Sequence, residues 1–336
     1  MTDNAPYLKD ETFEPILEEL NTLLAPIEER LVAAFDAPRR PILLVAGLPR
    51  SGTTMLMQML VGMFELGYPS NLLARFWRAP YIGARLVQEL RRGRRPLASN
   101  LHSELGATYG YDEPHEFTYF WRYWFPFNET HQPLDADLRQ LDCRFLQREL
   151  GALESAFGAP LAFKNPVVFS LNMERLGELF PTSVFLVCRR HPWYVAQSLL
   201  QSRLKLHGNR EHWFSIKPAE YPSLKDLPFA QQIAGQVYYT CLRIDQSLAK
   251  LAGDRFLIID YQELCQSPDQ TLRSVAGLVS TRGNELRLTG APPPALDGRD
   301  RQTVDDEVFD SLKSACSEFF GSALERWGKS AERVMG

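Results

Sequence analysis

Four short apolar segments are the first regular feature of the chain. They cover residues 42–46, 161–164, 182–190 and 255–260, and each contains a run of mostly apolar residues next to polar or turn-forming ones. Runs of this length and composition are typical of strands that are covered on both faces. We therefore expect four strands, of which those at residues 42–46 and 182–190 are buried.

Segments with helical patterning separate these strands. They cover residues 55–64, 79–92, 139–157, 231–251 and 268–279. Strands that alternate with helices imply right-handed βαβ crossovers and a parallel sheet. The sequence thus predicts an α/β fold with a central parallel β-sheet flanked by helices, and ligands at the carboxyl ends of the strands.

Apolar residues also recur at helical spacing near the start of the chain, in residues 14–35. This stripe consists of Ile16, Leu17, Leu20, Leu23, Leu24, Ile27 and Leu31. Pro26 interrupts it, and a proline inside a helix removes a backbone hydrogen bond. We expect two short helices with a kink between them, which form an N-terminal helical extension over residues 1–38. Such a stripe usually packs on its own domain, and we favour that role over docking.

The composition is that of an ordinary soluble globular protein. Of the 336 residues, 45% are hydrophobic and 23% are charged, and the net charge is −4. This charge argues against broad binding to nucleic acid or to anionic membranes. The sequence shows no signal peptide and no run of 18 apolar residues. The five cysteines are scattered without a C-x-x-C, so we expect buried thiols in a reducing cytoplasm and no zinc site.

Residues 41–54, PILLVAGLPRSGTT, form a candidate anion-binding loop at the end of the first strand. Gly47 and Gly52 have the G-x-x-x-x-G spacing of a phosphate loop, whose backbone N–H groups point at an anion beside a helix start. The candidate ligands are Arg50, Ser51, Gly52, Thr53 and Thr54. Loops that hold a magnesium nucleoside triphosphate have a Lys after the second Gly, where this chain has Thr53. A smaller, metal-free anion therefore fits better.

GLPRSGTT resembles the 5′-phosphosulfate loop of the sulfotransferases that use 3′-phosphoadenosine 5′-phosphosulfate (PAPS), in which P-[KR]-S-G-T-T is characteristic. The strand at residues 182–190 adds to the resemblance, because Arg190 ends it and Ser198 follows eight residues later, as in the family's 3′-phosphate motif. A strand-end Arg and a helix-borne hydroxyl suit a phosphate that carries nearly two charges. The resemblance covers roughly residues 40–280.

The resemblance implies a three-layer P-loop fold over residues 39–336 in a soluble, bacterial, cytoplasmic enzyme. Its reaction would move a sulfuryl group from PAPS to an acceptor hydroxyl, with PAP as product and no metal. The acceptor can be a small molecule, a lipid or a saccharide, and the sequence does not decide between them. A homodimer is one possible assembly state. The phosphate loop alone is also compatible with another function, that of a P-loop kinase of a small metabolite or of a non-catalytic nucleotide-binding protein. Thr53 in the Lys position and the lack of a Walker-B Asp count against the kinase.

Lys164 ends the strand at residues 161–164, so it should point into the same cleft as Arg50. In the family a Lys commonly ends this strand, close to the transferring sulfuryl group. Here Asn165 and Pro166 follow it, so the His that serves as base in the cytosolic animal sulfotransferases is missing. We expect Arg50 and Lys164 to act on the transferring group, and the base to come from elsewhere.

Residues 110–127, GYDEPHEFTYFWRYWFPF, combine His115 and Glu116 with many aromatic residues. Attack by a hydroxyl needs a base. His115 is the first choice because an unperturbed pKa of about 6.5 suits neutral pH, and Glu116 is the second. We expect the aromatic residues to wall the acceptor pocket, together with a loop at residues 204–229. Alternative bases are His102, His207 and His212.

Two further segments carry weaker implications. DYQEL at residues 260–264 resembles the family's Y-E-D-L element, whose Tyr lies near the adenine, so Tyr261 is a candidate adenine contact. RRGRR at residues 91–95 is expected to be a solvated charged surface. Acceptor-side insertions are expected near residues 95–135 and 203–230.

Overall fold

The four predicted strands form one parallel sheet in a computed structural model of the chain, which describes residues 10–92, 101–298 and 300–328. The strand order is β4-β1-β5-β6. The strands are β1 (Ile42–Gly47), β4 (Leu161–Lys164), β5 (Val184–Arg189) and β6 (Phe256–Asp260). Leu44 of β1 is paired with Phe163 of β4 on one side and with Phe185 of β5 on the other. The predicted strands and their parallel arrangement are confirmed.

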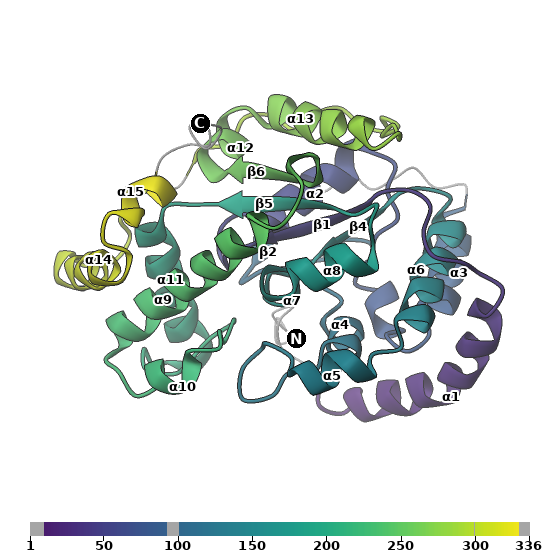
Figure 1. Cartoon of the computed structure of the whole chain (residues 1–336), viewed down its shortest axis with the longest axis horizontal. Helices are drawn as coiled ribbons and strands as arrows, with labels where there is room; N and C mark the ends of the chain where they lie inside the picture. Colours follow the sequence, from purple (N-terminus) through teal and green to yellow (C-terminus); the bar gives the residue numbers. More distant parts are fainter. Residues whose placement is uncertain (1–9, 93–100, 299, 329–336) are drawn as a thin grey trace.

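Helices cover both faces of the sheet, which makes three layers (Figure 1). Leu43 and Val45 face a core that they share with α2 (Thr53–Met63) and α13 (Pro268–Thr281). Leu44 faces the larger core on the other side. The helices that contribute to this larger core include α7 (Pro166–Leu171), α8 (Met173–Leu179), α9 (Pro192–His207) and α11 (Phe229–Leu248). Successive side chains of a strand point to opposite faces of the sheet. Because helices cover both faces, apolar residues are needed at every position of the strand.

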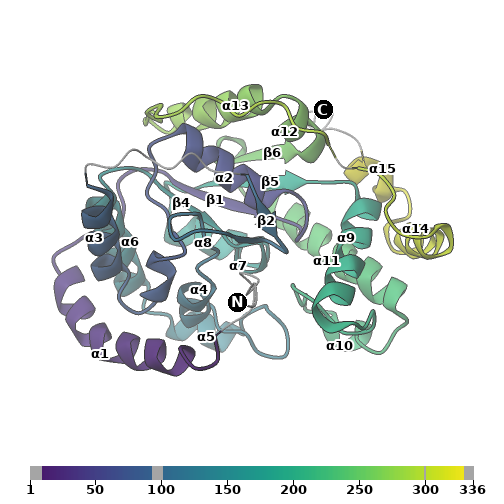
Figure 2. The same ribbon diagram turned by 180° about the vertical axis from the view of Figure 1, so that it is seen from behind.

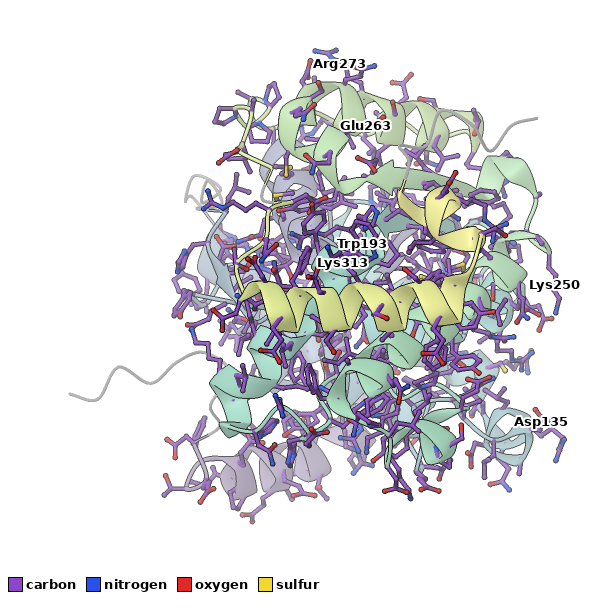
Figure 3. All side chains as sticks on the ribbon, turned by 90° about the vertical axis from the view of Figure 1, so that its left-hand side faces the viewer. Asp135, Trp193, Lys250, Glu263, Arg273 and Lys313 are labelled. Atoms are coloured by element: carbon purple, nitrogen blue, oxygen red, sulfur yellow. The ribbon has the colours of Figure 1, made fainter. Side chains whose placement is uncertain are left out.

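Shorter elements surround this centre. They are α3 (Pro80–Arg91), the hairpin of β2 (Ser103–Glu104) and β3 (Ala107–Thr108), α4 (Thr118–Trp124), α5 (Asp135–Gln140), α6 (Cys143–Phe157), α10 (Tyr221–Leu224), α12 (Tyr261–Gln266), α14 (Asp306–Phe320) and α15 (Ala323–Gly328). Helix α14 packs on α9 and α11, where Lys313 Nζ lies 5.8 Å from the ring centre of Trp193 (Figure 3). Within the described ranges, every helix is too short or too polar to span a bilayer.

Two predicted helices have other limits in the structure. The helix expected over residues 139–157 is divided into α5 and α6, because Asp142 accepts a hydrogen bond from Phe145 N at 3.0 Å and caps the start of α6. The helix after the loop begins at Thr53, two residues earlier than predicted, directly after Gly52. The hydroxyls of Thr53 and Thr54 therefore belong to the first helical turn.

The prediction of two short helices at the N-terminus is wrong. Residues Glu14–Val32 form a single helix, α1, that continues through Pro26 and follows a curve in Figure 1. One missing backbone hydrogen bond bends a helix without ending it when the flanking turns are held elsewhere. Here Asn21 and Glu28, on either side of the proline, are both buried and hydrogen-bonded to the segment at residues 75–82.

The expectation that the apolar stripe of α1 packs on the domain is also wrong. Of its seven residues Leu17 is buried and Leu24 is partly buried, whereas the other five are exposed. The side of α1 that faces the domain carries Leu17, Asn21, Glu28 and Val32. Hydrogen bonds of polar residues thus outweigh the apolar pattern in setting the orientation of this helix.

Candidate active site

The loop between β1 and α2 is held in a tight conformation by its neighbours. A side chain at Gly47, where φ is 134°, would place its Cβ 2.5 Å from Cys188 O on β5. At Gly52, where φ is 95°, a Cβ would lie 2.8 Å from the ring of Tyr261. Arg50 also has a positive φ of 69°. The two predicted glycines are therefore required by close approach, and the loop is bent around Arg50.

Ser51 has a different place from the other predicted loop ligands. Its side chain is fully buried, and its hydroxyl donates to Leu48 O at 2.6 Å. Its backbone N–H also bonds to Leu48 O, at 3.2 Å. Both donors of Ser51 close the loop, so its assignment as a cofactor ligand stays a prediction without geometric support. Arg50, Gly52, Thr53 and Thr54 line the cleft next to the loop.

The two basic motifs of the sequence meet at the carboxyl end of the sheet. Arg50 Nε donates to Ser198 Oγ on α9 at 3.0 Å, and Arg190 Nη1 donates to Arg50 O at 3.0 Å. Arg190 follows the last residue of β5, and its guanidinium lies 4.3 Å from the ring centre of Tyr261. Burial, and then the charge of Arg190, lower the pKa of Arg50. Two cations held this close to one another form a site for an anion.

The segment at residues 296–303 completes this end of the cleft. Asp300 Oδ1 accepts from Arg190 Nε at 2.7 Å, and Gln197 of α9 binds the backbone of Arg301 and Thr303. Arg301 lines the cleft. The only sign of this segment in the sequence is the run of charged residues after Gly298. Its distance along the chain from the phosphate loop follows no regular spacing. Arg299 lies outside the described residues.

The cleft has a volume of about 1110 Å³ and runs from this basic end to Glu116. Its basic end is lined by Arg50, Thr53, Arg190, Ser198, Tyr261 and Arg301. Its other part is lined by Leu101, His102, Leu105, Glu116, Val167 and Phe214. The hairpin of β2 and β3 lies beside α2 here (Figure 2), and Gly106 O accepts from Thr54 Oγ1 at 3.3 Å. The cleft can hold a charged nucleotide at one end and a more apolar molecule at the other.

Lys164 lies beneath the cleft, where its side chain contacts the phosphate loop, the β2–β3 hairpin and Glu116. Its Nζ lies 2.7 Å from Glu116 Oε1, 2.9 Å from Thr54 Oγ1 and 3.1 Å from Gly106 O. The Lys164 side chain is 2% exposed, whereas that of Glu116 is 34% exposed. Lys164 is not among the described residues that line the cleft, because its side chain is covered by Thr54, Gly106 and Glu116. That it acts in the same cleft as Arg50 stays a prediction. Through these contacts Lys164 can hold the Glu116 carboxylate at the cleft.

His115 and Glu116 have different surroundings. The chain is extended here, not helical. Glu116 lines the cleft, and His115 is not among the described residues that do. His115 Nδ1 accepts from Phe117 N at 2.9 Å, and burial lowers the pKa of His115 to about 4. A neutral imidazole has one acceptor nitrogen, and in His115 that nitrogen is already used. This geometry favours Glu116 over His115 as the base.

Two neighbours fix the position of Glu116. Asn165 Nδ2 donates to Glu116 O at 3.2 Å, so the residue directly after Lys164 holds the backbone of the candidate base. Phe117 has a φ of 54°, which is strained for a residue with a side chain. Its ring is buried and stacked on Phe120 at 4.7 Å, and this packing holds the strained turn.

The prediction that the aromatic residues at 117–127 wall the acceptor pocket is wrong. Phe117, Phe120, Trp121, Trp124 and Phe125 are buried in the larger core, and none of them lines the cleft described above. Trp121 makes edge contacts with Phe163 of β4 and Phe169 of α7, at 5.3 and 5.0 Å. These aromatic residues lie in α4 or next to its ends, on the side of the helix that packs into the larger core.

The predicted acceptor loop contributes in part. Phe214 and Ser215 line the cleft, and Ser215 has a φ of 67°. His102 also lines it. His207 and His212 stack on each other at 3.9 Å, and neither is among the described residues of the cleft. Of the alternative bases, His102 is therefore the one that lines the same cleft as Glu116.

Metal ligands and the arginine run add little to this site. Within the parts of the chain that the structure describes, no group of three or more His, Cys, Asp or Glu side chains could hold a metal ion. Arg91 forms an ion pair with Asp112, and Arg92 lies 3.0 Å from Glu89. The remaining residues of the predicted run at 91–95 lie outside the described residues.

Comparisons with known proteins give a family and a fold. A sequence model described as the sulfotransferase family matches residues 41–279. No curated protein matches the chain significantly. Sulfotransferase STF9 from Mycobacterium avium is similar in structure, with a TM-score of 0.53 and 16% identity over 92% of this chain and 83% of that one. Sulfotransferase STF1 from Mycobacterium tuberculosis H37Rv has a TM-score of 0.47 and 16% identity over 93% of this chain and 80% of that one.

Proposed function

The chain belongs to the sulfotransferase family, and we propose that it takes the sulfuryl group from PAPS, passes it to an acceptor hydroxyl and releases PAP. The observation that carries the PAPS assignment is the convergence of Arg50, Arg190 and Ser198 at one end of the cleft. Two cations and a hydroxyl provide for two anionic groups of a nucleotide without a metal. The acceptor oxygen forms a bond to sulfur as the bond from sulfur to the 5′-phosphate oxygen breaks.

The donor would occupy the basic end of the cleft. Arg50, Gly52, Thr53 and Thr54 would contact the 5′-phosphosulfate, at the positive end of α2. Arg190 and Ser198 would bind the 3′-phosphate. The Arg190 guanidinium lies over the Tyr261 ring, and this contact supports a position of Tyr261 beside the nucleoside. Asp300 holds the Arg190 guanidinium from the other side.

Glu116 would take the proton of the acceptor hydroxyl. Its carboxylate lines the cleft and is held by Lys164, whose contact with Thr54 ties the base to the phosphate loop. The apolar side chains of Leu105, Val167 and Phe214 leave room for an acceptor next to it. The class of acceptor, a cytoplasmic location and the limits of the insertions stay predictions.

Nucleotide-dependent thermal stability tests the donor assignment. We expect PAP or PAPS without magnesium to raise the melting temperature by about 5 °C or more at saturating concentration, because a ligand that binds only the folded state stabilises it. ATP with magnesium should have little effect. Stabilisation by ATP with magnesium but not by PAP would instead support a metabolite kinase. Binding of PAP without transfer of labelled sulfate to any acceptor in an extract screen would support a non-catalytic nucleotide-binding protein.

Arg50 and Lys164 are expected to contribute to the chemical step. Negative charge grows on the leaving oxygen as the bond from sulfur breaks, and fixed donors at the loop stabilise that charge. Arg50→Ala should lower kcat by about 10²-fold, as the removal of other such donors does. Lys164→Ala should lower kcat by a similar factor, because it removes the positive charge that holds both Thr54 of the loop and the Glu116 carboxylate. The matched control is Arg273→Ala on α13, an exposed arginine (labelled in Figure 3) that is not among the described residues of the cleft. An unchanged kcat with a raised KM would make both residues binding groups only.

A further inference from the structure

Helix α1 exposes an apolar seam along its whole length. The seam consists of Phe13, Ile16, Leu20, Leu23, Ile27 and Leu31, whose exposed fractions range from 37% to 65%. Successive members are separated by three, four, three, four and four residues. This is the spacing at which one helix packs along a second helix in a coiled coil. Proteins that function alone rarely expose an apolar patch of this extent.

The seam is exposed because the opposite side of α1 is anchored. Asn21 Nδ2 donates to Arg75 O at 2.8 Å, and Asn21 Oδ1 accepts from Arg78 N at 2.9 Å. Glu28 accepts from Tyr81 N at 2.6 Å and from Ile82 N at 3.1 Å, at the start of α3. Turning the seam inwards would leave these buried polar groups without partners, which is costly. Rotation of α1 on its own domain therefore cannot bury the seam.

The position of α1 makes the seam accessible to another molecule. Figures 1 and 2 both show α1 at the outer edge of the molecule, beside α3 and α6 and far from β6. The exposed charged residues of α1 are mainly acidic, namely Glu18, Glu19 and Glu29 against Arg30. Acidic residues beside an apolar stripe do not suit an anionic membrane surface. A protein helix with the same apolar spacing is the better match.

The charges beside the seam indicate a second copy of this chain in antiparallel orientation. Glu19 and Arg30 are eleven residues apart, which is about three helical turns, so they lie on the same side of the seam. Within the described residues neither forms an ion pair. A two-fold axis perpendicular to α1 midway between them places Glu19 of each copy opposite Arg30 of the other. Parallel helices would bring like residues to the same level and lose both pairs.

We propose that α1 is a dimerisation helix, in which two copies of this chain pair antiparallel through the α1 seam. Each copy buries its six apolar side chains between those of the other, and two Glu19–Arg30 pairs set the register. A single helix pair is smaller than the roughly 800 Å² per partner of a standard interface, so we expect a reversible dimer with a dissociation constant on the order of micromolar.

Sedimentation velocity over a dilution series tests the surface. The full-length protein should dissociate from dimer to monomer on dilution, and Leu23→Glu with Ile27→Glu should raise the dissociation constant by about 100-fold or more. The matched control is Leu288→Glu, which charges an equally exposed leucine outside α1. A monomer at all concentrations, or a dimer that the double variant leaves unchanged, would overturn the proposal.

Charge reversal tests the orientation without touching the apolar residues. Glu19→Arg alone, or Arg30→Glu alone, should weaken the dimer by about tenfold, because each creates two like-charge contacts. The combination of Glu19→Arg and Arg30→Glu should restore the affinity of the original protein. Both positions are exposed and neither lines the cleft, so PAP binding should not change. Single reversals without effect, or a double reversal without rescue, would rule out the antiparallel register.

Discussion

Glu116→Gln is expected to lower kcat by about 10²–10⁴-fold while the affinity for PAP stays the same. The amide keeps the size of the carboxylate, and its oxygen can still accept from Lys164. It cannot take the proton that the acceptor hydroxyl must lose as it attacks sulfur. PAP should bind unchanged because its proposed contacts are Arg50, Arg190 and Ser198 and do not include the Glu116 side chain. Steady-state kinetics together with PAP titration measures both quantities.

His115→Ala is the matched control for this experiment. The two residues are neighbours in sequence, but the acceptor nitrogen of His115 binds Phe117 N, and its side chain is not among the described residues of the cleft. Its loss should therefore affect stability more than kcat. If His115→Ala abolished turnover and Glu116→Gln kept it, the sequence-based preference for His115 would be correct. If both variants kept nearly full turnover, the base would lie elsewhere, and His102 would be tested next because it lines the cleft.

Arg190→Ala is expected to weaken PAP binding by roughly 10²–10³-fold, which corresponds to about 3–4 kcal/mol for the loss of a partly buried, charged hydrogen-bond partner. The matching observation is donor preference. Adenosine 5′-phosphosulfate lacks the 3′-phosphate, so the original enzyme should use it poorly, and Arg190→Ala should remove most of the preference for PAPS. Equal use of both donors by the original enzyme would contradict the assignment of the 3′-phosphate site.

Asp300 requires a second variant in the same experiment. Its carboxylate lies 2.7 Å from Arg190 Nε, so Arg190→Ala leaves a negative charge where the phosphate should bind. Some of the lost affinity would then come from repulsion by Asp300 and not from the missing arginine. Combining Arg190→Ala with Asp300→Ala separates the two effects, because the repulsive part should be recovered in the double variant.

The two arginines at the end of β5, Arg189 and Arg190, show how much the spacing in the sequence can decide. The spacing to Ser198 selected Arg190, and the structure places Arg190 at the cleft. Arg189, one residue earlier, forms an ion pair with Asp245 at 2.7 Å and lies 4.3 Å from the ring centre of Trp327. Successive side chains of a strand point to opposite faces, so neighbouring arginines have separate roles.

Local properties of the sequence were sufficient for the strands, the parallel sheet and the anion-binding loop. Apolar runs of four to six residues specify strands, and in β1, β4 and β5 every residue is buried because helices cover both faces of the sheet. Gly47 and Gly52 specify the loop because no other residue tolerates the backbone angles and the close approach of Cys188 and Tyr261. Arg190 and Ser198 were selected by their spacing in the family's 3′-phosphate motif, which this segment resembles.

Contacts between distant segments decided the rest, because no local pattern records them. Whether His115 or Glu116 faces the cleft depends on the strained turn at Phe117 and on a hydrogen bond from Asn165, 49 residues away. The part played by Asp300 depends on a loop 110 residues from Arg190. The apolar pattern of α1 predicted which residues share a side of the helix but not which side faces the domain. Asn21 and Glu28 decide that, since buried polar groups must keep their hydrogen bonds while apolar side chains can remain at the surface.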